Sequence, residues 1–306
     1  MKIKYKEEDF LVEEIPLLEF GTKENKYSYF LLNKNGKNTS DVINEICRHL
    51  RIHNKFIGFA GNKDKTAITS QYISIMTNIF EIKDIESFKI EGVSLKFAGY
   101  GSERINLGDL KGNRFVITVR QLNDEKELNP GKIKNYFGEQ RFGKNNLNSS
   151  IGKCLVKKNF RKVCELLSIK PNGNNFIEAI KGLDVRLLRL YVNAYQSMLW
   201  NEAARKIKNA DEVEVIGFLT EFENEDVKKI YGEIMKNEDI HKEEFLIKQI
   251  KEISMEGTKR KLFLDVKDFS YKWSDDELFP GKKKCVVSFC LDKGCYATVV
   301  IESLFG

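Results

Sequence analysis

The residues of this chain with the clearest capacity for chemistry surround one aspartate, Asp64, in the stretch 58–71, which reads GFAGNKDKTAITSQ. Lys63 and Lys65 flank it, and neighbouring cations favour the ionised form of a carboxylate. An ionised carboxylate can act as a nucleophile or as a general base. The same letters also suit an ordinary solvated hairpin turn, because glycine, asparagine and aspartate are common turn residues.

The hydrophobic pattern around Asp64 predicts a loop between two strands. A short apolar run at 56–60 precedes it, and a β-rich run at 68–75 follows it. Residues 61–65 should therefore form a tight loop that presents the carboxylate at a strand end.

Six residues of this stretch match a family signature in order and spacing. The signature is G-x-K-D-x-x-A-x-T-x-Q, and it resembles that of the TruD family of tRNA pseudouridine synthases. The matching residues are Gly61, Lys63, Asp64, Ala67, Thr69 and Gln71. In this family the aspartate is the catalytic residue, so the resemblance implies that role for Asp64.

Residues 4–14 resemble the N-terminal K-x-x-x-E-D-F-x-V-x-E pattern of the same family, with Glu7 where proline is usual. The resemblance makes Lys4 a candidate for the cation that balances Asp64. A lysine beside an edge strand would look the same in sequence.

Residues 112–115, GNRF, resemble the G-N-x-F element of the family. In that element the phenylalanine stacks on the target uracil and the asparagine helps to position the catalytic carboxylate. The resemblance thus assigns these roles to Phe115 and Asn113. A phenylalanine on a strand is far more often a core residue than a stacking platform.

A third match, 135–143, reads NYFGEQRFG and is nearly letter for letter the N-Y-F-G-x-Q-R-F-G of the family. Its aromatic rings, its glycines and the pair Gln140 and Arg141 suit a site that holds a flipped nucleotide and its phosphates. Arg141, Lys63 and Lys4 would contact phosphates or keep Asp64 ionised. The alternative is an aromatic packing hinge between domains.

The charge of the chain is unevenly distributed. Segment 211–257 carries fourteen acidic side chains against six lysines, a net charge of −8, so the remainder of this +6 chain carries +14. A basic surface of this kind favours a polyanionic partner. Lysine-rich surfaces can also serve solubility alone.

The sequence motifs of several functional classes are absent from this chain. None of the six cysteines forms a C-x-x-C pair, no G-x-x-x-x-G-K-[ST] loop occurs, and Gly99 and Gly101 lack the third glycine of a dinucleotide site. We therefore expect no metal, no nucleotide cofactor and no other cofactor. The N-terminus lacks a signal peptide and no apolar run reaches membrane-spanning length, so we expect a soluble cytoplasmic protein with no membrane partner.

A length of 306 residues suggests two domains. Strands are predicted at 88–97, 114–122, 260–266 and 285–301, and the last two, on either side of residues 279–281, would complete the catalytic sheet. A long helix is predicted at 184–208, with Leu187, Leu190 and Tyr191 on its inward face. The family resemblance implies an α/β (α+β) fold. Its mainly antiparallel catalytic domain would comprise 1–143 and 258–306, interrupted by a mostly helical inserted domain at 144–257.

The implied reaction is isomerisation of a tRNA uridine to pseudouridine, at position thirteen of the D-arm by family habit. Asp64 would add to the ribose or to the uracil, or remove a ribose proton to form a glycal, and the sequence leaves these routes open. Three other hypotheses are a non-catalytic RNA-binding protein, a pseudouridine synthase that acts on another RNA, and an RNA enzyme of different chemistry, such as a uridine hydrolase, that uses the same aspartate. The sequence is compatible with a monomer.

Overall fold

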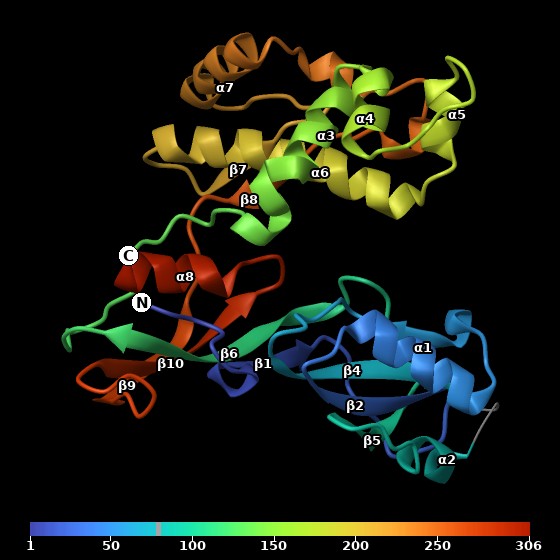
Figure 1. The fold of residues 1–306 in the computed structure, drawn as a ribbon, viewed down its shortest axis with the longest axis vertical. Coiled ribbons are helices and arrows are strands. Elements are labelled where there is room, and N and C mark those ends of the chain that lie inside the picture. Colours follow the sequence, from blue (N-terminus) through green and yellow to red (C-terminus); the bar gives the residue numbers. More distant parts are fainter. Residues whose placement is uncertain (78–80) are drawn as a thin grey trace. The chain divides into compact units, whose positions relative to one another are not determined.

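The stretch around Asp64 lies in the first of two units in the computed structural model, which describes residues 1–77 and 81–306 (Figure 1). Unit 1 contains residues 1–130, 265–297 and 304–306, and unit 2 contains residues 131–264 and 298–303. Among the helices of these described ranges, none is both long and apolar enough to cross a membrane.

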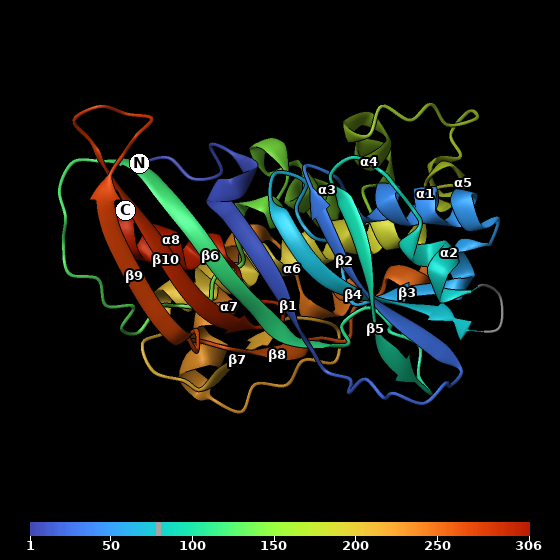
Figure 2. The ribbon, with the colours of Figure 1, turned by 90° about the horizontal axis from the view of Figure 1, so that it is seen from below.

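Unit 1 is organised by an eight-stranded sheet of order β5-β2-β4-β1-β6-β10-β9, with β3 paired to β4 (Figure 2). Its strands are β1 (Phe10–Pro16), β2 (Tyr27–Asn35), β3 (Ile57–Phe59), β4 (Ile68–Met76), β5 (Val93–Gly101), β6 (Leu110–Leu122), β9 (Lys267–Asp275) and β10 (Lys283–Asp292). The β1–β4 pair is parallel, and the other pairs of this sheet are antiparallel. The central parallel pair brings residues near the N-terminus beside the strand that follows Asp64.

Alternation along the strands decides which side chains enter the core of unit 1. On β2, Phe30, Leu32 and Lys34 are buried at every second position and so share one face. The apolar residues of that face pack with α1 (Thr39–Leu50) and α2 (Ile82–Glu86) in one hydrophobic cluster. A lysine therefore lies at the end of an otherwise apolar row.

Unit 2 is mainly helical, with one two-stranded sheet. Its helices are α3 (Leu147–Val156), α4 (Phe160–Leu166), α5 (Phe176–Lys181), α6 (Val185–Lys206) and α7 (Glu225–Glu238), and its strands are β7 (Glu212–Val215) and β8 (Thr258–Lys261). The core contains the fully buried Tyr195 and Trp200 of α6. At Gly152 of α3, an added Cβ would lie 2.0 Å from the carbonyl oxygen of Tyr191, so this glycine permits the close packing of α3 on α6.

The predicted fold class, an α/β structure with a largely antiparallel sheet and a mostly helical part, is confirmed. Three strand predictions were partly wrong. Of 88–97, only the part from Val93 is strand, because Gly92 (φ +72°) forms a turn before it. The strand predicted at 260–266 does not join the large sheet: β8 pairs with β7 in unit 2 instead.

The apolar run at 285–301 was predicted as strand throughout, but it divides into β10 and a terminal helix, α8 (Ala297–Phe305). The buried residues Ala297, Val300, Ile301 and Leu304 recur at helical spacing, and helical packing decided the outcome. On α6, Tyr191 is buried as predicted, but Leu187 and Leu190 are 38% and 37% exposed.

Candidate active site

The loop between β3 and β4 presents Asp64 to a cation from the N-terminal segment. Asp64 Oδ2 accepts a hydrogen bond from Lys4 Nζ at 2.5 Å, and the two side chains are 25% and 24% exposed. Lys4 has a left-handed backbone (φ +53°), which is uncommon for lysine. Its ammonium also lies 4.2 Å from the ring centroid of Phe10. The ion pair that the sequence predicted is present, and the Asp64 side chain is partly exposed to solvent.

A second ion pair lies beneath the first and is almost completely buried. Lys63 Nζ donates to Asn113 Oδ1 at 2.6 Å and lies 2.9 Å from Glu14 Oε2, with Lys63 and Glu14 only 7% and 1% exposed. Glu14 and Asn113 are register partners on β1 and β6. Because its ammonium is occupied by these partners, Lys63 connects the loop to the sheet and is not presented to solvent.

Gln71 of the signature and Thr39 of α1 hold the loop backbone. The hydroxyl of Thr39, at the start of α1, accepts from the Lys63 amide at 3.0 Å and donates to Gln71 Oε1 at 2.8 Å. Gln71 Nε2 donates to the carbonyl of Gly61 at 3.1 Å. The loop is thereby fixed to both α1 and β4, which explains a buried glutamine within a catalytic signature.

One residue of this site was missed in the sequence, namely Lys34. Its side chain is buried, and its Nζ donates to the carbonyl oxygens of Asp64 at 2.7 Å and Lys37 at 2.6 Å. Burial lowers the pKa of Lys34 to about 8; the charge of Asp64 acts to raise it, and that of Lys63 acts to lower it further. The signal was the alternation of β2, which places Lys34 on the same face as Phe30 and Leu32.

Phe115 lies two residues beyond Asn113 on the same face of β6. It is 7% exposed, and its ring centroid is 6.3 Å from that of Phe10 and 5.6 Å from that of Phe289. Since Lys4 lies over Phe10, a row of contacts connects Phe115 to Asp64. Asp64, Lys4, Lys63, Asn113 and Phe115 therefore form one cluster within unit 1.

Gln140 and Arg141 belong to unit 2. Both lie in a short 3-10 helix, Glu139–Arg141. Arg141 Nε donates to Ser197 Oγ of α6 at 3.3 Å. Asn201 of α6 accepts from the Phe137 amide and donates to the Phe137 carbonyl, both at 2.9 Å, so α6 holds the NYFG segment.

The same segment lines a cavity of about 430 Å³ within unit 2. Tyr136, Phe137 and Phe142 contribute aromatic faces, and Glu139 and Glu302 contribute carboxylates. Burial, and secondarily the charge of Glu139, raise the pKa of Glu302. The cavity shows that this motif borders open space as well as core.

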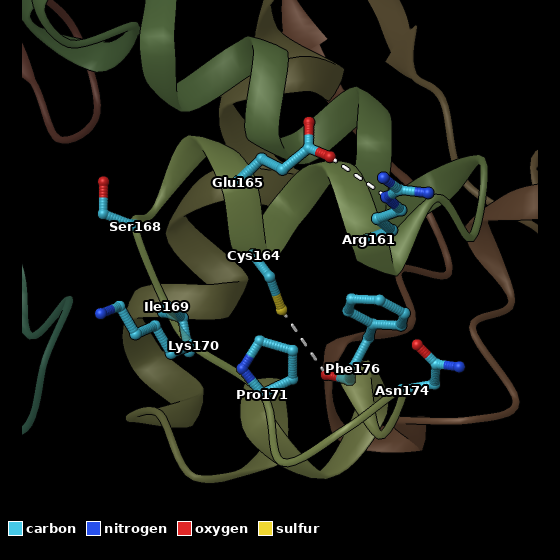
Figure 3. Close-up of a pocket in the computed structure, with 9 residues that line it drawn as sticks. All are labelled: Arg161, Cys164, Glu165, Ser168, Ile169, Lys170, Pro171, Asn174 and Phe176. Atoms are coloured by element: carbon cyan, nitrogen blue, oxygen red, sulfur yellow. Dashed lines mark hydrogen bonds and ion pairs between the residues drawn. The ribbon is translucent and has the colours of Figure 1, made fainter.

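Another cavity, of about 880 Å³, lies between α4 and the loop that leads to α5 (Figure 3). Cys164 points toward Phe176, and Arg161 pairs with Glu165 at 3.3 Å (Figure 3). Burial raises the pKa of the Cys164 thiol, which makes it a poor nucleophile.

Chemically, the cluster in unit 1 offers one accessible carboxylate with a cation at contact distance, on a loop fixed by buried hydrogen bonds. Such a group can attack an electrophilic carbon or remove a proton. A family model described as "tRNA pseudouridine synthase D (TruD)" matches residues 1–175 and 203–304. The chain belongs to the TruD family. The family and the enzyme class predicted from the motifs, a tRNA pseudouridine synthase and thus an isomerase, are confirmed.

Relatives in this family align over nearly the whole chain. A tRNA pseudouridine synthase D of Aquifex aeolicus is 30% identical, with 100% of this chain and 98% of the relative covered. A probable tRNA pseudouridine synthase D of Methanosarcina acetivorans is 27% identical, over 98% of this chain and 91% of the relative. The crystal structure of a putative TruD from Methanosarcina mazei superposes with a TM-score of 0.76 at 25% identity, covering 99% of this chain and 93% of that one.

Proposed function

We propose that this TruD-family chain converts the uridine at position thirteen of tRNA, in the D-arm, into pseudouridine, with Asp64 as the catalytic carboxylate. The observation that carries the proposal is the geometry of Asp64: a quarter exposed, ion-paired with Lys4 at 2.5 Å, and set on a loop with buried anchors. The conversion breaks the bond between ribose C1′ and uracil N1 and forms a bond between C1′ and C5. One proton leaves C5 and one is gained at N1, so the reaction is an isomerisation without redox change.

Asp64 begins this sequence as an anion in contact with an ammonium. It either adds to the ribose or the uracil, or removes a ribose proton to give a glycal. Lys4 neutralises the Asp64 carboxylate before the reaction. Its flexible side chain can keep the ammonium near the carboxylate while the charge of the carboxylate changes. Asn113 and Lys63 act beneath the carboxylate, where their hydrogen bond of 2.6 Å joins the loop to β6.

Phe115 holds the uracil by stacking while the freed base turns. Base–aromatic stacking is commonly worth about 1–3 kcal/mol. Phe115 now packs between Phe10 and Phe289, so the uracil would replace part of this packing. Gln140 and Arg141 of unit 2 contact the tRNA, and residues 144–257 form the inserted domain.

The test is incubation with unmodified tRNA followed by detection of pseudouridine, with the isosteric variant Asp64→Asn in parallel. We expect product from the wild type and a loss of at least about 1,000-fold in the variant, because removal of a nucleophile or base usually costs this much. tRNA binding should persist in both proteins. A transcript with cytidine at position thirteen should give no product.

Other outcomes would favour the alternatives. Product from Asp64→Asn at the wild-type rate would remove Asp64 from its catalytic role. Binding of tRNA without product, across a panel of RNAs, would favour an RNA-binding protein. Product only on an RNA other than tRNA would keep the chemistry and change the substrate.

A further inference from the structure

The buried amine of Lys34 is unusual in having backbone carbonyls as its partners. It lies on β2 opposite Thr69 of β4 and Val93 of β5, neither of which titrates. Within the described ranges 1–77 and 81–306, the hydrogen bonds of its Nζ go to the carbonyls of Asp64 and Lys37. A buried charge without a carboxylate partner is costly, so it needs a reason to be there.

The two carbonyls belong to different connections. Asp64 lies in the β3–β4 loop, and Lys37 lies between β2 and α1. By donating to both carbonyls, Lys34 links the two connections to each other. One end of this link is Asp64, the proposed catalytic residue. Fixing the carbonyl of Asp64 fixes the Asp64–Lys65 peptide plane, and with it the position of the Asp64 Cα to which the side chain is attached.

We propose that Lys34 is a positioning residue for the carboxylate of Asp64, which it orients through the Asp64 carbonyl and stabilises with its positive charge. This inference rests on the proposed function of Asp64. Unlike Lys4, Lys34 does not have to meet the substrate. Its effect should therefore appear in the rate of the bound complex and not in tRNA affinity.

The charged state of Lys34 provides a readout that a purely structural residue would lack. Its pKa is lowered to about 8, primarily by burial. The charged groups that act on it are Asp64 and Lys63, both in the β3–β4 loop. Lys34 should therefore lose its proton, and with it the charge near Asp64, as the pH rises through about 8.

The experiment measures kcat and KM on unmodified tRNA for the wild type, Lys34→Met and the control Lys96→Met between pH 6.5 and 9.5. Methionine retains the length of the side chain without donor or charge. We expect kcat of Lys34→Met at pH 6.5 to fall about 100-fold, as for other small misplacements of a reacting group. KM should change less than about three-fold, the pattern of a contact used after binding.

The kcat of the wild type should exceed that of Lys34→Met by a smaller factor as the pH rises above 8. Lys96 is an exposed lysine of β5, so its variant should match the wild type.

Lys34→Arg is the second variant, and it tests the inference even if Lys34→Met fails to fold. Its guanidinium keeps donors and charge at every pH used, so the loss of kcat above pH 8 should disappear. Any of three results would overturn the inference. They are a wild-type kcat in Lys34→Met, a ratio of wild-type to Lys34→Met kcat that does not change with pH, and a loss of kcat above pH 8 that persists in Lys34→Arg. Asp64→Asn, assayed in the same series, separates the two proposals: an active Asp64→Asn refutes the role of Asp64, whereas an inactive one beside a fully active Lys34→Met refutes the role of Lys34 alone.

Discussion

Lys4, Lys63 and Lys34, which lie near Asp64, differ in what surrounds their amines. Lys4 is a quarter exposed and pairs with the carboxylate, and Lys63 is buried against Glu14 and Asn113. Lys34 is buried against carbonyls. Sequence motifs identified Lys4 and Lys63 because the family pattern contains them. Which amine meets which partner depends on strand register, and the Lys63 pairing was therefore not predictable.

Lys34 should make the stability of the protein depend on pH. Its pKa is about 8 in the folded chain against a usual value of 10.5, so the unfolded chain binds more protons between these values. Stability from this residue is therefore lowest below pH 8 and rises as the pH increases toward 10.5, by an upper bound of about 3 kcal/mol. Urea unfolding of the wild type and Lys34→Met at pH 7 and pH 10 should show that the wild type gains relative to the variant. Parallel changes in the two proteins would contradict the shift.

At the level of elements, the strands before and after Asp64 were predictable and the C-terminal ones were not. The loop at 61–65 lies between β3 and β4, as the flanking apolar runs indicated. In the run 285–301, by contrast, β-branched residues favour strand locally, yet α8 forms because its apolar residues pack at helical spacing. Pairing of β8 with β7 is a contact between distant segments, which local periodicity does not encode.

Two glycines of the stretch 58–71 should differ in how much stability the protein loses when each is replaced by alanine. At Gly58, on β3, a Cβ would lie 2.2 Å from the Ile105 carbonyl and 2.5 Å from Ser74 Oγ, which accepts from the Ile105 amide. Gly58→Ala should therefore destabilise the protein by about 1–3 kcal/mol or more, as overpacking does.

At Gly61 a Cβ would meet nothing within 4 Å, so Gly61→Ala should stay within about 0.5 kcal/mol of the wild type. Urea unfolding of both variants checks this pair. Equal losses would show that β3 is not packed as described, since only Gly58 faces backbone at close range.

At the scale of the whole chain, the net charge of +6 is the sum of an acidic segment, 211–257, and a basic remainder, and this separation bears on RNA binding. The acidic segment 211–257 includes α7, and several of its carboxylates are already paired with lysines of unit 2, as in Lys153–Glu238 and Lys157–Asp239. The remaining residues carry a net charge of +14, part of which, including Lys153 and Lys157, is paired with this segment and not free for a polyanion. Composition predicted this division, whereas which cations are neutralised internally required the structure.

Binding of tRNA should therefore be strongly dependent on salt. Each phosphate contact adds roughly 0.7–0.9 to the slope of log affinity against log salt, so affinity should fall at least about tenfold between 50 and 200 mM KCl.

If Arg141 contacts a phosphate as proposed, Arg141→Gln should weaken binding to all tRNAs alike and reduce the slope by about one. Asp64→Asn should retain the wild-type slope, because Asp64 is proposed to meet the nucleoside and not the phosphates. Filter binding or fluorescence titration at four salt concentrations measures these slopes. An Arg141→Gln slope equal to that of the wild type would assign Arg141 to its contacts with Ser197 and Phe137, and so to the packing of unit 2.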